Sequence, residues 1–393
     1  MLQAANSEPE VFPVKLSILK EHLNESISHV SKAITSRTPI PILSGIKFDA
    51  DEEGVRLTAS DADITIQSFI PAEKDGVQVI RLEQAGSVVL PAKFFGEIIK
   101  KLPSHEIEIE IRPPFHATIR SGGSEVQMVG LDPEEYPQLP LIEEKKVVSV
   151  PSDLLKTMIR QTSYAVSTSE TTPILTGVLC SLDENGLKFI SCDRHRLAQR
   201  ETPLAAGPDQ FFRGVVISGK TLNELSKVLP DENSFTDIVV SDNQVLFRMD
   251  NLLFYSRLLE GTYPDTSKLI PLQFQTEIVV SGKLLTEAID RAYLLSREEK
   301  TNIVKLVMNE DRTLEISSSS SELGKVTETI PVEQLTGNLL KISFNSKYML
   351  EALRVIDSEG VRLSFTGAMS PIIIEPLGET KVLQLILPYR TTN

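Results

Sequence analysis

One segment of the sequence has the spacing of a nucleotide-binding loop. Residues Gly214–Thr221 (GVVISGKT) fit the pattern G-x-x-x-x-G-K-[ST], in which successive backbone N–H groups cradle phosphates. The variable positions here are Val-Val-Ile-Ser, which favour a strand. The equivalent junctions at 278–284 (IVVSGKL) and 88–94 (VVLPAKF) lack the motif. We therefore interpret the segment as a strand that enters a helix, and we expect no bound nucleotide and no other cofactor.

Two further segments carry side chains that could act in catalysis. Asp193–Arg196 (DRHR) contains the most conspicuous His, but no Ser or Cys nucleophile motif accompanies it and no second His is near in sequence. Asp61 and Asp63 could form a carboxylate pair, yet they align with Asp193 and His195. A turn that follows a strand in both places explains the residues more simply, so the sequence predicts a protein that is not an enzyme.

Composition limits the remaining classes. The chain has 393 residues and a net charge of -14, which favours a soluble protein of several domains and argues at first sight against a polyanionic partner. Cys180 and Cys192 are too few and too widely spaced for a metal site or a disulfide framework, which indicates a reducing compartment. Residues 1–12 lack a basic start and an apolar core, and no long apolar run follows. We expect a cytoplasmic protein with a flexible N-terminal tail at 1–12.

The chain contains an internal repeat. Thr38–Ile46 (TPIPILSGI) returns as Thr171–Val178 (TTPILTGV), after a helix pattern and before a strand pattern in both cases. The first copy ends on Asp132–Pro137 (DPEEYP) and the second on Gly261–Asp265 (GTYPD). The remaining third, from about Thr276, follows the same order of elements. Three copies of one unit are therefore predicted.

Each copy contains two units in which a short strand leads into a helix. Ser or Pro precedes or begins five of the six helices, as is typical of helix starts, and alternating runs such as Ile107–Ile111 predict strands. We expect an α+β fold in which each domain packs two helices on antiparallel sheets, with domains at 13–140, 141–271 and 272–393. The strands are Val14–Ile18, Ser87–Leu90, Val147–Val150, Gly214–Ile217, Glu277–Val280 and Leu340–Phe344, and the helices are Ser17–Ile34, Ala92–Leu102, Ser152–Ala165, Ser218–Leu229, Ser281–Arg297 and Ser346–Ile356.

The predicted helices differ in charge from the rest of the chain. They hold fourteen Lys or Arg against eight Asp or Glu, although the whole chain is acidic. If the six helices shared one side of an assembly, that side would be basic and would suit a phosphate backbone. The alternative is that exposed helix faces simply favour Lys and Arg. The sixfold recurrence is what favours the first interpretation.

Six motifs in collinear order identify a family. The motifs are Pro41–Gly45 (PILSG), Ser60–Ile64 (SDADI), Pro173–Gly177 (PILTG), Asp193–Ala198 (DRHRLA), Ser364–Gly367 (SFTG) and Leu385–Arg390 (LILPYR). Through them the chain closely resembles the bacterial sliding clamps, the beta subunits of DNA polymerase III, over essentially its whole length from Val14.

The resemblance implies a head-to-tail homodimeric ring of three tandem clamp domains per protomer, which encircles duplex DNA without sequence specificity. Such a ring confers processivity by topology and needs no nucleotide, because a separate clamp loader complex opens it. The implied partners are DNA, the polymerase catalytic subunit, the clamp loader and other proteins with a clamp-binding motif. The residues expected to face DNA are Arg37, Lys20, Lys93, Lys100, Lys156, Arg160, Lys220, Lys227, Lys283, Arg291, Lys347 and Arg354.

The resemblance also implies a pocket that takes a short partner peptide with Leu and Phe anchors, and a dimer contact. The dimer contact pairs Val126 and Met128 on an edge strand with Leu284 and Leu285 near a helix. Leu175 and Leu269 fit a core position equally well. The pocket residues are Leu175, Cys192, Arg194, His195, Arg196, Leu197, Pro264, Lys268, Leu269, Asn345, Tyr348, Met369, Pro371, Leu387, Pro388, Tyr389 and Arg390.

The sequence departs from the family pattern at this pocket. Arg194 stands in place of a small residue, Cys192 in place of Thr, and Tyr389 in place of a flexible apolar residue, while Thr391–Asn393 extend the usual end. We hypothesise a functional clamp with an altered pocket, a second copy less sensitive to pocket-binding inhibitors. A P-loop enzyme, which would bind ATP through Lys220, and a protein-only scaffold, which circular DNA would never retain, are the alternatives.

Overall fold

The computed structural model describes residues 14–35, 38–139, 142–143, 146–231, 233–298, 300–320 and 322–390. Packing divides the chain into two compact units, residues 1–149 with 235–257 (unit 1) and residues 150–234 with 258–393 (unit 2). The segment expected to form the second domain therefore contributes to both units. The expected tail at 1–12, and Thr391–Asn393, lie outside the described residues.

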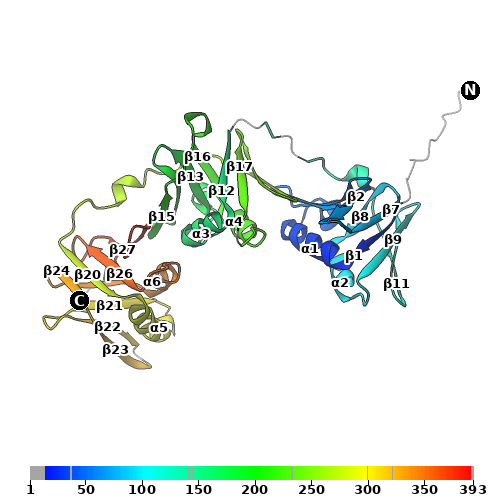
Figure 1. Ribbon diagram of the computed structural model, residues 1–393. Helices are drawn as coiled ribbons and strands as arrows, with labels where there is room; N and C mark the ends of the chain where they lie inside the picture. Colours follow the sequence, from blue (N-terminus) through cyan, green and yellow to red (C-terminus); the bar gives the residue numbers. More distant parts are fainter. Residues whose placement is uncertain are drawn as a thin grey trace, which may run out of the picture. The chain divides into compact units, whose positions relative to one another are not determined.

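Within its described residues, unit 1 contains two larger antiparallel sheets and two α-helices. Helix α1 (Lys20–Val30) and helix α2 (Ala92–Lys101) lie side by side (Figure 1). Strands β5 (Glu73–Lys74) and β6 (Val77–Gln78) form a short hairpin. One sheet has the order β11 (Ser124–Val129), β10 (His116–Ser121), β9 (Glu106–Arg112), β1 (Val14–Leu19), β7 (Ile80–Gln84). The other has the order β12 (Lys146–Pro151), β17 (Phe235–Val240), β18 (Gln244–Met249), β19 (Leu252–Arg257), β4 (Ile64–Pro71), β3 (Gly54–Ser60), β2 (Gly45–Asp51), β8 (Gly86–Pro91).

The described part of unit 2 repeats this plan with four α-helices. Helix α3 (Ser152–Thr162) lies beside α4 (Gly219–Ser226), and α5 (Gly282–Glu298) lies beside α6 (Ser346–Leu353). A nine-stranded sheet has the order β16 (Phe212–Ser218), β13 (Gly177–Asp183), β14 (Gly186–Cys192), β15 (Arg196–Thr202), β28 (Lys381–Ile386), β27 (Ile372–Pro376), β26 (Gly360–Phe365), β20 (Thr276–Ser281), β24 (Gln334–Gly337). A four-stranded sheet has the order β23 (Gly324–Pro331), β22 (Thr313–Ser320), β21 (Ile303–Met308), β25 (Lys341–Asn345).

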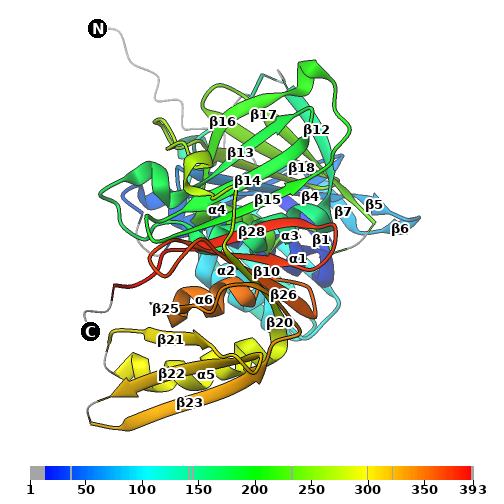
Figure 2. The same ribbon diagram turned by 90° about the vertical axis from the view of Figure 1, so that its left-hand side faces the viewer.

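The nine-stranded sheet joins two sequence repeats. Strand β15 of the second repeat pairs antiparallel with β28 of the third, from Arg196 opposite Ile386 to Glu201 opposite Lys381 (Figure 2). In unit 1, β4 of the first repeat pairs in the same way with β19 of the second. Because a strand on each side of the repeat boundary completes the ladder, the repeats share sheets and are not separate globules.

Alternation of residue type explains the strands and the helix faces. In β9 the side chains of Ile107, Ile109 and Ile111 are fully buried, whereas Glu106 and Glu108 face solvent. In α5 the residues Leu285, Ala288, Ile289 and Ala292 lie in the core of unit 2, at the spacing of one helix face. The expected α+β fold with helices on antiparallel sheets is confirmed.

The helix boundaries differ in part from the prediction. Ser17 does not begin the first helix, because β1 continues to Leu19, where it still pairs with β9. At α6 it is Asn345, not a Ser, that caps the helix, since its Oδ1 accepts a hydrogen bond from the N–H of Lys347 at 3.0 Å. The remaining predicted helices agree with α2 to α6 to within three residues at their ends.

The first two repeats match in atomic detail. The Pro-Ile-Leu motifs form equal 3-10 turns, η2 (Pro41–Ser44) and η5 (Pro173–Thr176). The closing tyrosines also agree, because Tyr136 donates its hydroxyl to Gly45 O at 3.4 Å and Tyr263 donates to Gly177 O at 3.4 Å. The predicted duplication is therefore confirmed for these two copies. Within the described residues, none of the helices has the length and apolar character needed to span a bilayer.

Candidate partner-binding site and nucleic-acid interface

The segment Asp193–Arg196 forms a tight turn between β14 and β15. Asp193 Oδ1 accepts hydrogen bonds from the N–H groups of His195 at 3.0 Å and Arg196 at 3.1 Å, and Arg194 has a φ of 76°. Asp61 makes the same turn in the first repeat, accepting from Asp63 and Ile64 at 3.1 and 2.8 Å around Ala62 with a φ of 78°. The interpretation of both motifs as one kind of turn is confirmed.

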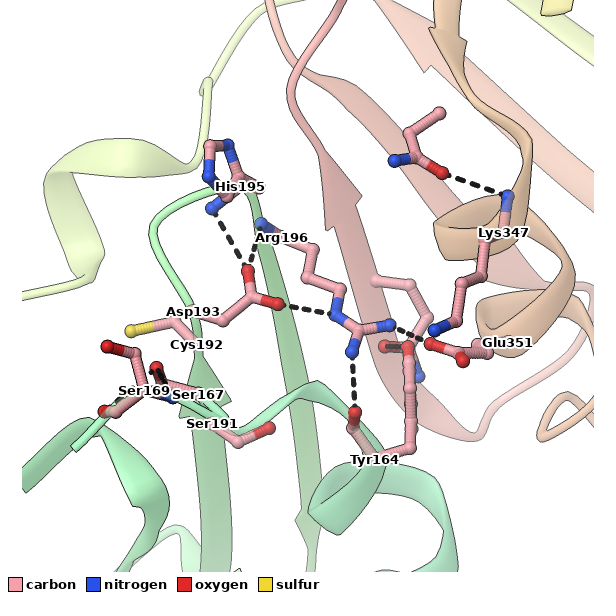
Figure 3. Close-up of polar contacts among 12 residues, drawn as sticks. Tyr164, Ser167, Ser169, Ser191, Cys192, Asp193, His195, Arg196, Lys347 and Glu351 are labelled. Atoms are coloured by element: carbon pink, nitrogen blue, oxygen red, sulfur yellow. Dashed lines mark hydrogen bonds and ion pairs between the residues drawn. The ribbon is translucent and has the colours of Figure 1, made fainter. Parts of the chain in front are cut away.

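Arg196 connects this turn to the helices of unit 2 (Figure 3). Its guanidinium donates to Asp193 Oδ2 at 2.9 Å and to the Tyr164 carbonyl at 2.8 Å, and it forms an ion pair with Glu351 in α6. It also lies over the ring of Tyr348, 4.6 Å from the centroid. Burial opposes the charge, but the hydrogen bond to Glu351 and the charge of Asp193 outweigh it and raise the pKa of Arg196. Arg196, a predicted pocket residue, therefore ties the turn to Tyr164 and α6.

A buried apolar cluster underlies the turn. Leu175, Cys192 and Leu197, all predicted pocket residues, pack with Ile373 and Leu385 and each is less than 9 % exposed. Burial raises the pKa of the Cys192 thiol. Four predicted residues leave apolar surface exposed, namely Leu269 (49 %), Met369 (56 %), Leu387 (40 %) and Tyr389 (52 %). Leu269 adjoins Ile270, which packs on the cluster, and Leu387 directly follows β28.

Backbone hydrogen bonds hold the segment after β28 against the turn and against β25. Leu387 N–H donates to His195 O at 2.9 Å, and Tyr389 N–H donates to Ser343 O at 2.7 Å. The His195 ring stacks on Tyr348 with centroids 6.2 Å apart. The structure thus brings the turn, β28 and α6 together. Among the other predicted pocket residues, Pro388 forms a β-bridge with Phe344, and Asn345 caps α6. Arg194 donates a hydrogen bond to Thr172 Oγ1, and Lys268 forms an ion pair with Asp265. Pro371 directly precedes β27, while Pro264 and Arg390 are exposed.

The residues that match the nucleotide-binding pattern form strand β16 and the start of helix α4. Val215, Val216 and Ile217 are buried in β16 and pair with β13, so their N–H groups cannot form a phosphate loop. Gly219 and Lys220 open α4. The interpretation as a strand that enters a helix is confirmed.

The predicted DNA-facing cations fall into two groups. Several are held by carboxylates, as in the pairs Lys156–Asp231, Arg160–Asp357, Lys227–Glu224, Arg291–Glu328 and Arg354–Asp290. Lys20 donates to the Leu102 carbonyl at the end of α2. In the part of the chain that the structure describes, Lys93, Lys100, Lys283 and Lys347 are exposed and form no ion pair. Lys220 is exposed at the start of α4, and Arg37 lies outside the described residues.

Three of the four predicted dimer residues lie at a sheet or helix surface, and the fourth lies in the core. Strand β11, with Val126 and Met128 half-buried, is an edge strand as predicted. Leu284 is 39 % exposed on α5, whereas Leu285 is fully buried in the core of unit 2. Leu284 is thus the member of this pair that offers an exposed surface.

Three residues that form hydrogen bonds or ion pairs at the site were not predicted from the sequence. Tyr164 donates its hydroxyl to Gln384 Oε1 at 2.6 Å, Glu351 pairs with Arg196, and Tyr263 accepts from Cys192 N–H at 3.0 Å. The Tyr-Pro motif shared with Tyr136 could have indicated Tyr263. Nothing local to Tyr164 or Glu351 marks them.

Comparisons with known proteins agree with this geometry. Models of the DNA polymerase III beta subunit match three consecutive stretches, the N-terminal domain at 14–140, the central domain at 149–265 and the C-terminal domain at 267–390. The beta sliding clamp of Bacillus subtilis is 50% identical over 378 residues, covering 96% of this chain and 100% of that protein. The chain belongs to the bacterial beta sliding clamp family.

Solved clamps share the fold over the same length. The crystal structure of the Bacillus subtilis DNA polymerase sliding clamp matches with a TM-score of 0.93 at 50% identity, and covers 96% of this chain and 100% of that chain. The beta subunit from Streptococcus pyogenes matches with a TM-score of 0.91 at 34% identity, with the same coverage. The Staphylococcus aureus beta sliding clamp is 43% identical over 378 residues, covering 96% of this chain and 100% of that protein.

Proposed function

We propose that the chain forms a homodimeric ring that encircles duplex DNA and tethers the polymerase and other proteins through the apolar site beside the Asp193–Arg196 turn. As a beta sliding clamp it is a non-catalytic subunit that confers processivity on DNA polymerase III. The observation that carries the proposal is the run of three clamp-domain matches along one chain. The proposal includes domains at 13–140, 141–271 and 272–393, a cytoplasmic, nucleoid-associated location, and a clamp loader that opens the ring.

Two open sheet edges support ring closure. Strand β11 ends the five-stranded sheet of unit 1, and β23 ends the four-stranded sheet of unit 2. Unpaired edges offer backbone donors and acceptors to another strand, and edges from different sheets favour a heterologous, head-to-tail contact. The exposed side chains of Phe94 (64 %) and Leu284 (39 %) lie on α2 and α5, in the same two repeats.

Disruption of this contact should give monomers. Leu284→Glu places a charge at the proposed interface, so sedimentation should report half the wild-type mass at micromolar concentration. Leu272→Glu is a matched control, because Leu272 is 94 % exposed and outside both edges. A dimer that persists in Leu284→Glu would remove this interface from the proposal.

The exposed helix lysines support a sequence-independent grip on DNA. Phosphate contacts carry no base information, so a closed ring can slide along the duplex. When the loader has placed the protein on a nicked circle, gel filtration should show retention on the circle and release after a restriction enzyme linearises it. Protein that never stays on the circle, or that stays on linear DNA, contradicts encirclement.

Free and paired cations should contribute unequally. Lys93, Lys100 and Lys283 meet phosphates without first losing a carboxylate, whereas Arg291 is held by Glu328 at 2.8 Å. Replacing one free lysine by Ala should reduce the salt slope of DNA affinity by about 1, and Arg291→Ala should reduce it less. Equal slopes in all variants would contradict a role for these helices.

We further propose an altered pocket, because the chain departs from the family pattern at Arg194, Cys192 and Tyr389. Tyr389 adds exposed apolar surface, and the Arg194 guanidinium places a cation at the rim through its hydrogen bond to Thr172. A fluorescent family-consensus peptide should therefore bind with an affinity that changes several-fold in Arg194→Ala, and a pocket-binding inhibitor should follow the same trend. Met369→Ala should weaken the peptide about tenfold as a positive control. If the peptide and the inhibitor bind with the affinity usual for the family, and Arg194→Ala does not change it, the proposal of an altered pocket is contradicted.

A further inference from the structure

Unit 1 contains a cavity that the proposed function does not use. It has a volume of about 290 Å³ and is lined by residues that include Ile40, Leu43, Thr65, Gln244 and Arg257. These come from three places in the sequence: the turn η2, strand β4 with the turn before it, and strands β18 and β19. The cavity therefore lies where the first repeat shares its sheet with the second.

The cavity occupies the place in unit 1 that the proposed peptide site occupies in unit 2. The turns at Asp61 and Asp193 have the same hydrogen bonds, as do the tyrosines that close the two repeats. The neighbouring strand is also attached in the same way, since Arg257 N–H donates to Asp63 O at 3.0 Å and Leu387 N–H donates to His195 O at 2.9 Å. The duplication has thus produced two equivalent sites.

The two sites differ in their side chains. Leu197 and Leu385, paired across β15 and β28, correspond to Thr65 and Tyr255, paired across β4 and β19. The unit 1 cavity keeps an apolar floor, where Leu43 is 1 % exposed, and a partly exposed wall at Ile40, but its sides are polar. Gln244 lines the cavity, and its buried Oε1 has no hydrogen-bond partner among the described residues. A buried acceptor without a partner is costly, and a ligand N–H would satisfy it.

We propose that this cavity is a second peptide-docking site, which binds a short extended segment of a partner protein that inserts one aliphatic side chain. The volume lies at the lower end of ligand pockets and suits one side chain with its flanking peptide groups. The aliphatic group contacts Leu43 and Ile40, and a peptide N–H donates to Gln244 Oε1. Asp63 and Arg257 at the rim have opposite charges, so the site favours a neutral segment. This inference rests in part on the proposed peptide site of unit 2, whose place in the fold the cavity shares.

The probe for this site is blocked leucine, N-acetyl-leucine N-methylamide, which has one aliphatic side chain between two peptide groups. Methyl-labelled full-length protein is titrated and observed by NMR. The methyl signals of Ile40 and Leu43 should shift and saturate with a Kd of about 1 mM, as ligand efficiency indicates for a dozen heavy atoms. Because the readout is specific to unit 1, binding at Leu387 or Met369 is scored separately.

Two matched comparisons make the result decisive. Blocked alanine, which lacks the aliphatic group, should bind at least about fivefold more weakly. Thr65→Trp fills the cavity and should abolish the shifts, whereas Thr118→Trp, on strand β10 of the other sheet, should retain them. Absence of saturation at Ile40 and Leu43 in the wild type, equal binding of blocked alanine, or full binding in a folded Thr65→Trp variant would each overturn the site.

Discussion

Arg196 in β15 and Glu351 in α6 form an ion pair across a sequence separation of 155 residues. The Arg196 side chain is only 9 % exposed and also lies over the Tyr348 ring. This pair ties a strand of the second repeat to a helix of the third. It therefore stabilises the part of unit 2 that carries the turn at Asp193.

Loss of the Glu351 charge should destabilise the protein. Glu351→Gln leaves the buried Arg196 with Asp193 as its remaining anion, and we expect the free energy of unfolding to fall by about 2 kcal/mol. Urea unfolding followed by circular dichroism measures the change. Glu359→Gln, an exposed carboxylate of the same unit, should change stability by less than about 0.5 kcal/mol. Equal effects of the two variants would show that the ion pair contributes nothing.

The equivalent turns predict different responses to glycine. Ala62 and Arg194 have φ values of 78° and 76°, a region that glycine adopts without strain. Ala62→Gly should stabilise the protein by about 0.5 kcal/mol. Arg194→Gly removes the same strain but also the hydrogen bond to Thr172, so thermal unfolding should show a smaller gain or a loss. The reverse order would mean that the Arg194 side chain does not stabilise the turn.

The repeat made part of this structure predictable. Asp61 and Asp193 follow equivalent strands, so the two copies of the turn can be compared in the sequence alone. The predicted start of the first helix at Ser17 was wrong. Serine is a residue type that often begins helices, but here the pairing of β1 with β9 extends to Leu19. Tyr164 and Gln384 are 220 residues apart, and no local pattern records their hydrogen bond. The helix start and this hydrogen bond both depend on contacts between residues far apart in the sequence, and the periodicity of the sequence does not record such contacts.

The thiols should be unreactive in the native protein. Burial raises the pKa of both Cys180 and Cys192, so the reactive thiolate is scarce at pH 8 in addition to being shielded. Alkylation by iodoacetamide, resolved by peptide mass spectrometry, should be on the order of 100-fold slower than in urea. Cys180, whose surroundings are wholly buried, should be the slower of the two. Modification of native Cys192 at the urea rate would contradict its place in the apolar cluster.

Acid should remove the contribution of the Arg291–Glu328 pair on α5 and β23. The hydrogen bonds from Arg291 lower the pKa of Glu328, so the folded state holds this carboxylate ionised to a lower pH than the unfolded chain does. The stabilisation is complete above the unfolded pKa of about 4.3 and is lost as pH falls through the lower folded value. Melting temperatures of wild type and Glu328→Gln should therefore differ by a constant amount from pH 8 to about 5 and converge as the pH falls through the lowered pKa of Glu328 in the folded state.

A matched variant separates this pair from the general effect of acid. Glu379 is exposed and has no ion pair among the described residues, so Glu379→Gln should follow the wild-type curve at every pH. If Glu328→Gln also follows it, the pair is screened by solvent and does not stabilise the fold. If Glu328→Gln melts below the wild type only at a pH where Glu328 is ionised in the folded state, the carboxylate holds Arg291 in place. Under the proposed function, Glu328 would then compete with duplex DNA for that guanidinium.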